Sequence, residues 1–378
     1  MFKHVLHLFA VFLSVIACDR DLDFAFVDPD AVDDFTIDNL TLDNFPFMDC
    51  STSTSPLRDM VMYTLLDIPY QWGLDILSGS QYAVWFMLPD GMEQGSEEHR
   101  AFTDKLNYDL RRSSGSHGAY VNLIDGVSGV IIDSRDISRN EATYAREKGV
   151  TVKTKPLAWD ALVFIVHPDN QVESLTQEQI RGIYTGRITN WKEVGGADHE
   201  IHAYTRDPDS GSQEKMETLV LKGEKMIDLP EMMGMTMLSP YISIEADEWG
   251  IGFTPYYFCE RMVGDLRGVK VLAVDGASPT PETILHGVQG KSDAYPFFSN
   301  IYAAIRADEP ADSFPSQIYR WLSTPAAKDI VDKSGYISLR NHWYHPRSNR
   351  PWWFSYSIAS QPCGTICFLW PGWNGTEK

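Results

Sequence analysis

Residues 175–196 read LTQEQIRGIYTGRITNWKEVGG, and this stretch begins with the pattern of a helix. Thr176 and Gln179 have the spacing of a capping box, in which each side chain satisfies a backbone N–H at the start of the helix. Ile180 and Ile183 then recur at helical spacing, and Gly186 stands where helices commonly stop. The stretch therefore predicts a short capped helix that ends near Gly186.

Outward from this helix, short apolar runs alternate with amphipathic helical patterns from Pro46 to about Leu339. Residues 129–133 and 161–166 are continuous aliphatic or β-branched runs, as expected for strands that are covered on both faces. Residues 269–274 form a third strand candidate. The alternation predicts an α/β fold.

Further helices are predicted from their first residues. Ser55 and Pro56 precede apolar residues at helical spacing, and Pro is favoured in the first turn of a helix. Ser138 and Glu141 form a second capping-box pattern. Residues 315–334 carry apolar residues on one face and predict a late helix that docks on the fold.

The composition limits the classes of function. A chain of 378 residues is long enough for two domains, and its 43% hydrophobic and 22% charged residues are ordinary for a globular protein. A formal net charge of −20 argues against nucleic-acid binding, which usually requires a basic face. A small anion is not excluded, because neutral donors and one local arginine can hold it.

The N-terminus is typical of an export signal. An apolar run from Val5 to Ala17 follows a short basic start and is too short to span a bilayer. Cys18 follows Val-Ile-Ala, a pattern that resembles the bacterial lipoprotein box, in which the cysteine is acylated. We therefore predict a lipoprotein signal in residues 1–18 with lipidation of Cys18. An ordinary signal peptide cleaved after Ala17 is the alternative.

Two segments at the ends differ from the rest of the chain. Residues 19–43 are rich in Asp and are predicted to form an acidic tether. Residues 341–378 contain five of the eleven Trp residues and are interpreted as an appended extension, which docks on a partner, packs on the fold or lacks structure.

The cysteines leave several pairings open. After acylation of Cys18, three disulfide pairings are possible, and the sequence does not choose between them. The sulfur and imidazole groups of the extension fit no known zinc spacing, so no metal and no other cofactor is expected. The residues concerned are Cys50, Cys259, Cys363 and Cys367 for the disulfides, and His342, His345, Cys363 and Cys367 for the metal.

Three Ser- and Thr-rich turns each lead into a helical pattern, at residues 49–57, 114–119 and 206–214. The first N–H groups of a helix have no partner within the helix, so an oxyanion finds donors there. Arg206 adds a two-pronged cation and Gly211 allows close approach of the backbone. Any one of these turns is most often only a helix cap. Three of them with an arginine are more than capping requires.

The same turns occur in an order that resembles a known family. Residues 175–196 look like the helix-turn-Trp signature of the phosphate-binding components of bacterial ABC transporters. The sequence Arg206-x-x-x-Ser210-Gly-Ser212 resembles the ligand loop of that family. The likeness covers about residues 44–340 and identifies the chain as a member of the type II periplasmic binding protein-like superfamily.

The resemblance implies a two-lobed fold with a hinge of crossing strands near residues 157–160 and 252–255. It divides the chain into a first lobe made of residues 44–157 and 254–340, and a second lobe made of residues 158–253. It implies ligand contacts in the cleft from Thr54, Ser55, Ser116, Ser134, Arg135, Arg206, Ser210, Gly211 and Ser212.

Two positions depart from the family pattern. Cys50 stands where many relatives have glycine, and it adds a side chain beside the binding backbone. Ser134 stands where well-studied phosphate binders have the carboxylate that accepts the proton of the ligand. The second departure bears on the choice between phosphate and other oxyanions.

We therefore predict a monomeric, lipid-anchored protein of the bacterial cell envelope, on the periplasmic or surface side. It captures phosphate or a similar tetrahedral oxyanion and delivers it to an ABC transporter permease, without catalysing a reaction. A domain repurposed for sensing or adhesion is the main alternative. A phosphate-ester hydrolase is the other, and no nucleophile-elbow motif surrounds the candidate serines.

Overall fold

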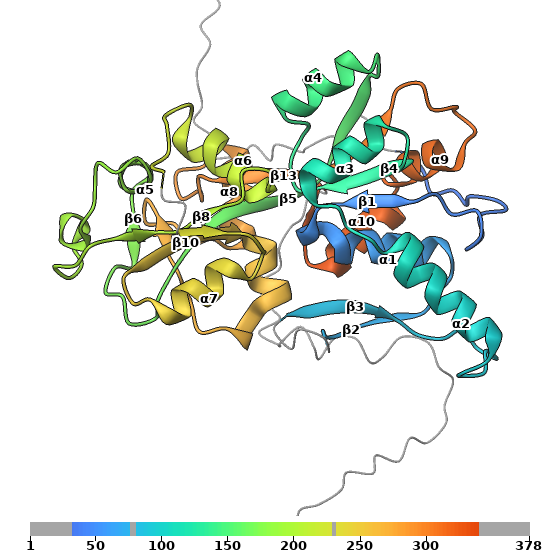
Figure 1. The fold of residues 1–378 in the computed structure, drawn as a ribbon, viewed down its shortest axis with the longest axis horizontal. Helices are drawn as coiled ribbons and strands as arrows, with labels where there is room; N and C mark the ends of the chain where they lie inside the picture. Colours follow the sequence, from blue (N-terminus) through green and yellow to red (C-terminus); the bar gives the residue numbers. More distant parts are fainter. Residues whose placement is uncertain (1–31, 76–80, 229–231, 340–378) are drawn as a thin grey trace, which may run out of the picture. The chain divides into compact units, whose positions relative to one another are not determined.

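The computed structural model describes residues 32–75, 81–228 and 232–339. A mixed sheet with the strand order β1-β4-β13-β5-β10-β7 runs through them, and β11 and β14 also pair with β5 (Figure 1). Its strands are β1 (Met48–Cys50), β4 (Val130–Asp133), β5 (Val152–Val166), β7 (His202–Ala203), β10 (Gly250–Pro255), β11 (Lys270–Val271), β13 (Phe298–Arg306) and β14 (Ile337–Ser338). The α/β fold with two lobes predicted from the sequence is confirmed.

Strand β5 joins the two lobes. Its first part pairs antiparallel with β13, which also pairs with β4. Its last residues pair instead with β10 and β11. The register against β13 shifts by one residue at Leu157, beside Pro156, which has no N–H to give to the ladder. This bulge lies at Leu157, within residues 157–160, where one of the two crossing strands of the hinge was predicted.

The first lobe packs helices around β1, β4 and the first part of β5. Strand β4 and the helix after β1 are almost wholly buried, in agreement with their apolar sequences. The additional elements are α1 (Ser55–Leu65), β2 (Tyr70–Leu74), β3 (Tyr82–Phe86), α2 (Glu97–Asp104), α3 (Gly115–Ile124), α4 (Arg139–Glu147), α9 (Phe314–Trp321) and α10 (Pro325–Ser334).

The second lobe forms around the last part of β5. Both predicted capping boxes are present, at Ser138 for α4 in the first lobe and at Thr176 for α5 in the second. The additional elements are β6 (Ser174–Leu175), α5 (Gln177–Tyr184), β8 (Thr205–Arg206), α6 (Gly211–Lys215), β9 (Met233–Gly234), α7 (Ser239–Ala246), β12 (Ala273–Val274) and α8 (Pro281–Gln289). A π-helical segment, Met216–Leu221, directly continues α6.

One segment that was predicted in the first lobe pairs with strands of the second lobe. Residues 270–274 were expected in the first lobe, but β11 pairs with the end of β5 and β12 pairs with β6. The Tyr295 hydroxyl also donates to the Leu162 carbonyl, 2.9 Å away. These backbone pairings keep residues 270–274 beside β5 and β6, although Tyr257 and Arg261, before them in the chain, contact Tyr336 and Trp72 of the first lobe.

Two local predictions also differ from the structure. The described part of the expected tether, residues 32–43, packs Phe35 against the core beneath the guanidinium of Arg320. Asp34 accepts the backbone N–H of Ala326 at 2.8 Å, near the start of α10. The single helix expected over residues 315–334 is two helices, because Thr324 caps a new helix whose first residue is a proline.

No helix among the residues shown in colour in Figure 1 is both long and apolar enough to cross a membrane. The predicted signal in residues 1–18, with Cys18, lies outside the described residues. The extension 341–378 and its His and Cys residues lie outside them as well.

Candidate functional site

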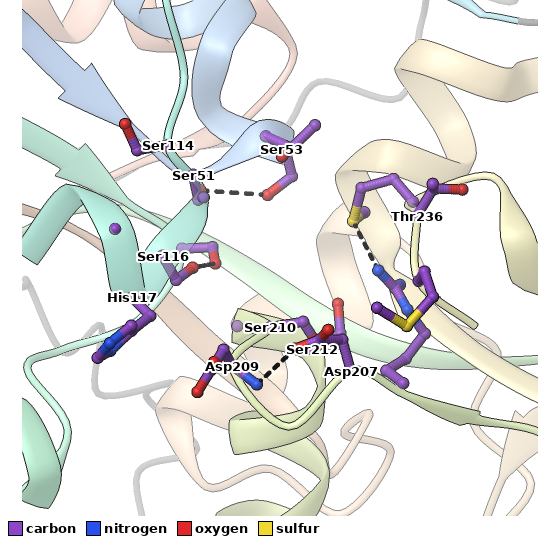
Figure 2. A pocket seen from close by; sticks show the side chains of 18 residues that line it. Ser51, Ser53, Ser114, Ser116, His117, Asp207, Asp209, Ser210, Ser212 and Thr236 are labelled. Carbon is purple, nitrogen blue, oxygen red and sulfur yellow. Dashed lines mark hydrogen bonds between the residues drawn. The ribbon is translucent and has the colours of Figure 1, made fainter. Parts of the chain in front are cut away.

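A cavity of about 590 Å³ lies between the two lobes, and Figure 2 shows its lining. All three hydroxyl-rich turns singled out in the sequence reach it. The first lobe contributes Ser51, Thr52, Ser53, Ser114, Gly115, Ser116, His117, Gly118 and Ser134, and the second contributes Arg206, Asp207, Asp209, Ser210, Gly211, Ser212, Met235, Thr236 and Met237.

The first turn connects β1 to α1 and presents hydroxyl groups other than those expected. Thr54 and Ser55 are absent from the lining of the cavity. The Thr54 hydroxyl donates to the Ile132 carbonyl at 2.7 Å, and the Ser55 hydroxyl donates to the Thr52 carbonyl at 2.9 Å. These two hydroxyls hold the shape of the turn, while residues 51–53 line the cavity.

Cys50, the departure from glycine in this turn, lies at the end of β1 and does not line the cavity. Its side chain is fully buried, and burial raises the pKa of its thiol to about 12. The thiol is therefore a neutral core group at physiological pH. Cys50 and Cys259 are both free and buried.

Asp49 joins the first turn to the second. Its carboxylate accepts the backbone N–H groups of Cys50 at 2.8 Å and Ser114 at 2.9 Å, and the side-chain amide of Asn122 at 2.7 Å. Ser114 directly precedes α3, which carries Ser116 in its first turn. These bonds hold the start of α3 beside the end of β1, so that both turns reach the same cavity.

Ser116 and Ser134 meet the second lobe at Gly211. Their hydroxyl oxygens lie 3.4 Å apart, and both side chains are buried. A Cβ atom at position 211 would lie 2.5 Å from the Ser134 hydroxyl and 2.6 Å from the Ser116 hydroxyl, closer than atoms can pack. The close approach of the lobes at this point therefore requires glycine.

The third turn caps α6 and carries the remaining residues that were predicted to contact the ligand. The Ser210 hydroxyl accepts the backbone N–H of Gln213 at 3.1 Å, as an N-cap does. Gly211 and Ser212 follow as the first helical residues, with N–H groups that have no partner within the helix. Arg206 lies at the end of β8, four residues before the cap.

Arg206 is buried and forms no ion pair among the described residues, and of the carboxylates only the neighbouring Asp207 acts on its charge. Its side chain donates from Nε to the Gly234 carbonyl at 3.3 Å and from Nη2 to the Met237 sulfur at 3.5 Å. Its Nη1 is buried and finds no hydrogen-bond partner within the described part of the chain. Burial lowers the pKa of Arg206 to about 10, so the group is still cationic at neutral pH. An anion in the cavity can supply the missing partner.

Arg135, the other predicted ligand arginine, is already paired. Its Nη2 lies 2.6 Å from one carboxylate oxygen of Glu141, and its Nη1 lies 2.8 Å from the other. Arg135 is absent from the lining of the cavity, although Ser134 beside it is present. Glu141 also completes the capping box of α4 and contacts the His117 ring. The pair therefore fixes the loop after β4 and occupies both terminal nitrogens of the guanidinium, while the buried Nε has no partner within the described residues.

Three charged groups lie close to the lining residues but do not belong to the lining. Burial raises the pKa of Asp133 to about 7, and the Ser116 hydroxyl opposes this shift with a hydrogen bond. Lys215 lies 3.7 Å from Asp160, and burial lowers the pKa of the lysine and raises the pKa of that aspartate. Within residues 32–75, 81–228 and 232–339, no group of His, Cys, Asp and Glu side chains could hold a metal ion.

Residues 90–320 match the family model of the PBP superfamily domain. The chain belongs to the PBP superfamily. Within this superfamily, the phosphate-binding protein PstS of Borreliella burgdorferi is 27% identical over 251 residues, which are 62% of this chain and 80% of that protein.

Solved structures are similar to the chain as well. A substrate-binding protein from Clostridium perfringens, solved with bound phosphate, is 26% identical with a TM-score of 0.50, over 63% of this chain and 91% of that one. An ABC-type phosphate transport receptor from Vibrio cholerae has the same fold at 22% identity, with a TM-score of 0.51, over 77% of this chain and 99% of that one.

One segment of the cavity wall of this PBP-superfamily protein carried no signal in the sequence. Residues 235–237 follow β9, which pairs with β8 and so brings them beside Arg206. Methionines separated by one residue are typical of many loops, and only the β8–β9 pairing places these at the site. His117, Asp207 and Asp209 were within the quoted turns but were not singled out as ligand contacts.

Proposed function

We propose that this protein is an extracytoplasmic solute-binding protein that captures phosphate between its two lobes for an ABC transporter. The bound phosphate in the Clostridium perfringens relative and the name of the Borreliella burgdorferi relative support this function. The protein performs no chemistry on the ligand, since a cavity with helix starts and hydroxyl groups needs no nucleophile to hold an oxyanion.

The observation that carries the proposal is the unpaired cation of Arg206. A buried charge without a partner is costly, and among the described residues no carboxylate forms an ion pair with this guanidinium. The cavity beside it is lined by hydroxyl groups and by the starts of α3 and α6. A tetrahedral oxyanion satisfies both the cation and these donors.

The proposed ligand contacts combine the predicted residues with the lining of the cavity. Residues 51–53 replace Thr54 and Ser55 in the first turn, and Arg135 is assigned to the ion pair with Glu141 instead of the ligand. The remaining contacts are Ser116, Ser134, Arg206, Ser210, Gly211 and Ser212.

We further propose that Cys18 carries lipid chains and that the monomeric protein works at the outer face of the membrane, where it meets a transporter permease. The apolar run before Cys18 supports the anchor. The superfamily membership supports the permease as partner.

Isothermal titration calorimetry of the full-length protein in mild detergent tests the function. We expect phosphate to bind, and we expect Arg206→Ala to weaken its affinity at least about a hundredfold, because the variant removes the charged partner of a buried anion. Arg187→Ala is the matched control, since this arginine is half-exposed and pairs with Glu178 and Glu224 away from the cavity.

Sulfate and molybdate complete the titration and measure the choice among oxyanions. Weaker sulfate binding is expected, because sulfate has no proton to donate to the hydroxyl oxygens of the cavity. Absence of binding by all three anions contradicts the proposal and favours the sensing or adhesion alternative.

A further inference from the structure

Part of the cavity wall is made of methionine side chains, which suit an inorganic anion poorly. Met235 and Met237 line the cavity on either side of Thr236, which Figure 2 shows on the second-lobe side, across from Ser51 and Ser53. We call Met235 and Met237 the methionine wall. A thioether donates no hydrogen bond, so it offers nothing to the oxygens of phosphate.

The methionine wall touches the cationic end of the site. The Met237 sulfur lies 3.5 Å from Nη2 of Arg206, and the Met237 side chain packs against the core. Met235 is 63% exposed, the largest exposed fraction among the large apolar side chains of the described second lobe. An apolar group joined to an anion at Arg206 therefore lies beside the Met237 thioether, and Met235 lines the same cavity.

The size of the cavity points to the same kind of ligand. Its volume of about 590 Å³ falls within the range of roughly 300–1,000 Å³ that is typical of pockets for small organic molecules. Such pockets combine an apolar surface with a few convergent polar groups. Here the hydroxyl groups and Arg206 supply the polar part, and the methionine wall supplies the apolar part.

We propose that the cavity binds phosphoryl compounds that carry a small apolar substituent, with the phosphoryl oxygens at Arg206 and the hydroxyl groups and the substituent on the methionine wall. This proposal rests on the proposed function, since it uses the same oxyanion site. Methionine suits this role because its unbranched, polarisable side chain adapts to substituents of different shape.

Calorimetry with four ligands tests the substrate class in the full-length protein. The ligands are inorganic phosphate, methylphosphonate, phenylphosphonate and phenyl phosphate. Comparing phenylphosphonate with phenyl phosphate shows whether the cavity prefers a carbon–phosphorus bond or an ester bond. Comparing methylphosphonate with phenylphosphonate shows the effect of substituent size on affinity. We expect at least one of the two phenyl compounds to bind as tightly as phosphate or more tightly.

Substitutions at Met235 identify the surface that holds the substituent. We expect Met235→Ser to weaken the affinity for the tighter-binding phenyl compound about tenfold and to change the affinity for phosphate by no more than about twofold, because only the substituent loses apolar contact. Met235→Leu restores the affinity for the phenyl compound. Met233→Ser is the matched control, since Met233 is an exposed neighbour that does not line the cavity.

The outcomes separate this proposal from the proposed function. Phosphate binding without binding of any substituted compound overturns the substrate class and leaves the function standing. Equal weakening of phosphate and of the phenyl compound by Met235→Ser also overturns it, since Met235 then serves only to close the lobes. Failure of all four ligands contradicts the proposed function itself.

Discussion

Arg135 and Arg206 are buried to nearly the same degree, at 7% and 4% exposed, yet the structure uses them in opposite ways. Arg135 forms a two-pronged ion pair with both oxygens of Glu141 within its own lobe, and only its Nε lacks a partner in the described ranges. Arg206 contacts a carbonyl and a thioether and has one buried nitrogen without a partner among the described residues. A buried cation with its counter-charge inside the fold stabilises a loop, whereas a buried cation without one is prepared for a ligand.

The loops around the two arginines show the same division. After β4, the backbone carries Ser134 to the cavity while the next side chain turns to α4. After β8, the turn to α6 places the guanidinium, the cap hydroxyl and the glycine at the cavity together. The arginine after β4 therefore stabilises its own loop, whereas the arginine of the turn after β8 faces the ligand cavity.

The largest expected effect is on stability, and it tests whether Arg135 supports the fold while Arg206 does not. We expect Arg135→Ala to lower the free energy of unfolding by about 3–5 kcal/mol, because it leaves Glu141 buried without its cation. Arg206→Ala should change it by less than about 1 kcal/mol, since it breaks no described ion pair and only two long hydrogen bonds, to the Gly234 carbonyl and the Met237 sulfur. Urea unfolding of both variants without ligand measures the difference, and equal losses contradict the assignment.

A second prediction concerns the contact between the lobes. Gly211→Ala should weaken phosphate binding at least about tenfold, because the added carbon collides with the hydroxyls of Ser116 and Ser134. Gly268→Ala is the control, since a Cβ there meets open space. Unchanged affinity in Gly211→Ala shows that the lobes need not approach here.

A third prediction is a pH dependence at Asp133, whose Oδ1 accepts the backbone N–H of Arg135 while Oδ2 has no partner in the described ranges. Burial raises the pKa of Asp133 to about 7, from the 3.8 that is ordinary for an aspartate. The folded state therefore holds a proton that the unfolded state has released, so stability falls as pH rises from about 4 through 7. Asp133→Asn should flatten this part of a plot of Tm against pH. Parallel plots for the parent and the variant contradict the shift.

Much of the fold was predictable from local patterns. The apolar run at 130–133 and the boxes at Ser138 and Thr176 depend on residues close in sequence, so their strands and helices were correctly placed. The pairing of β11 with β5 and of β12 with β6 was not predicted, because it depends on backbone hydrogen bonds that leave no mark on side-chain type.

The sequence by itself determined that three hydroxyl-rich turns each start a helix and that an arginine accompanies the last one. Helix caps and glycine turns are local, so a few neighbouring residues specify them. Only the tertiary structure decided which hydroxyls reach the cavity, which arginine has no ion pair in the described chain and why Met235 and Met237 stand beside it. These properties depend on partners far away in the chain, such as Ile132 for Thr54 and β9 for β8.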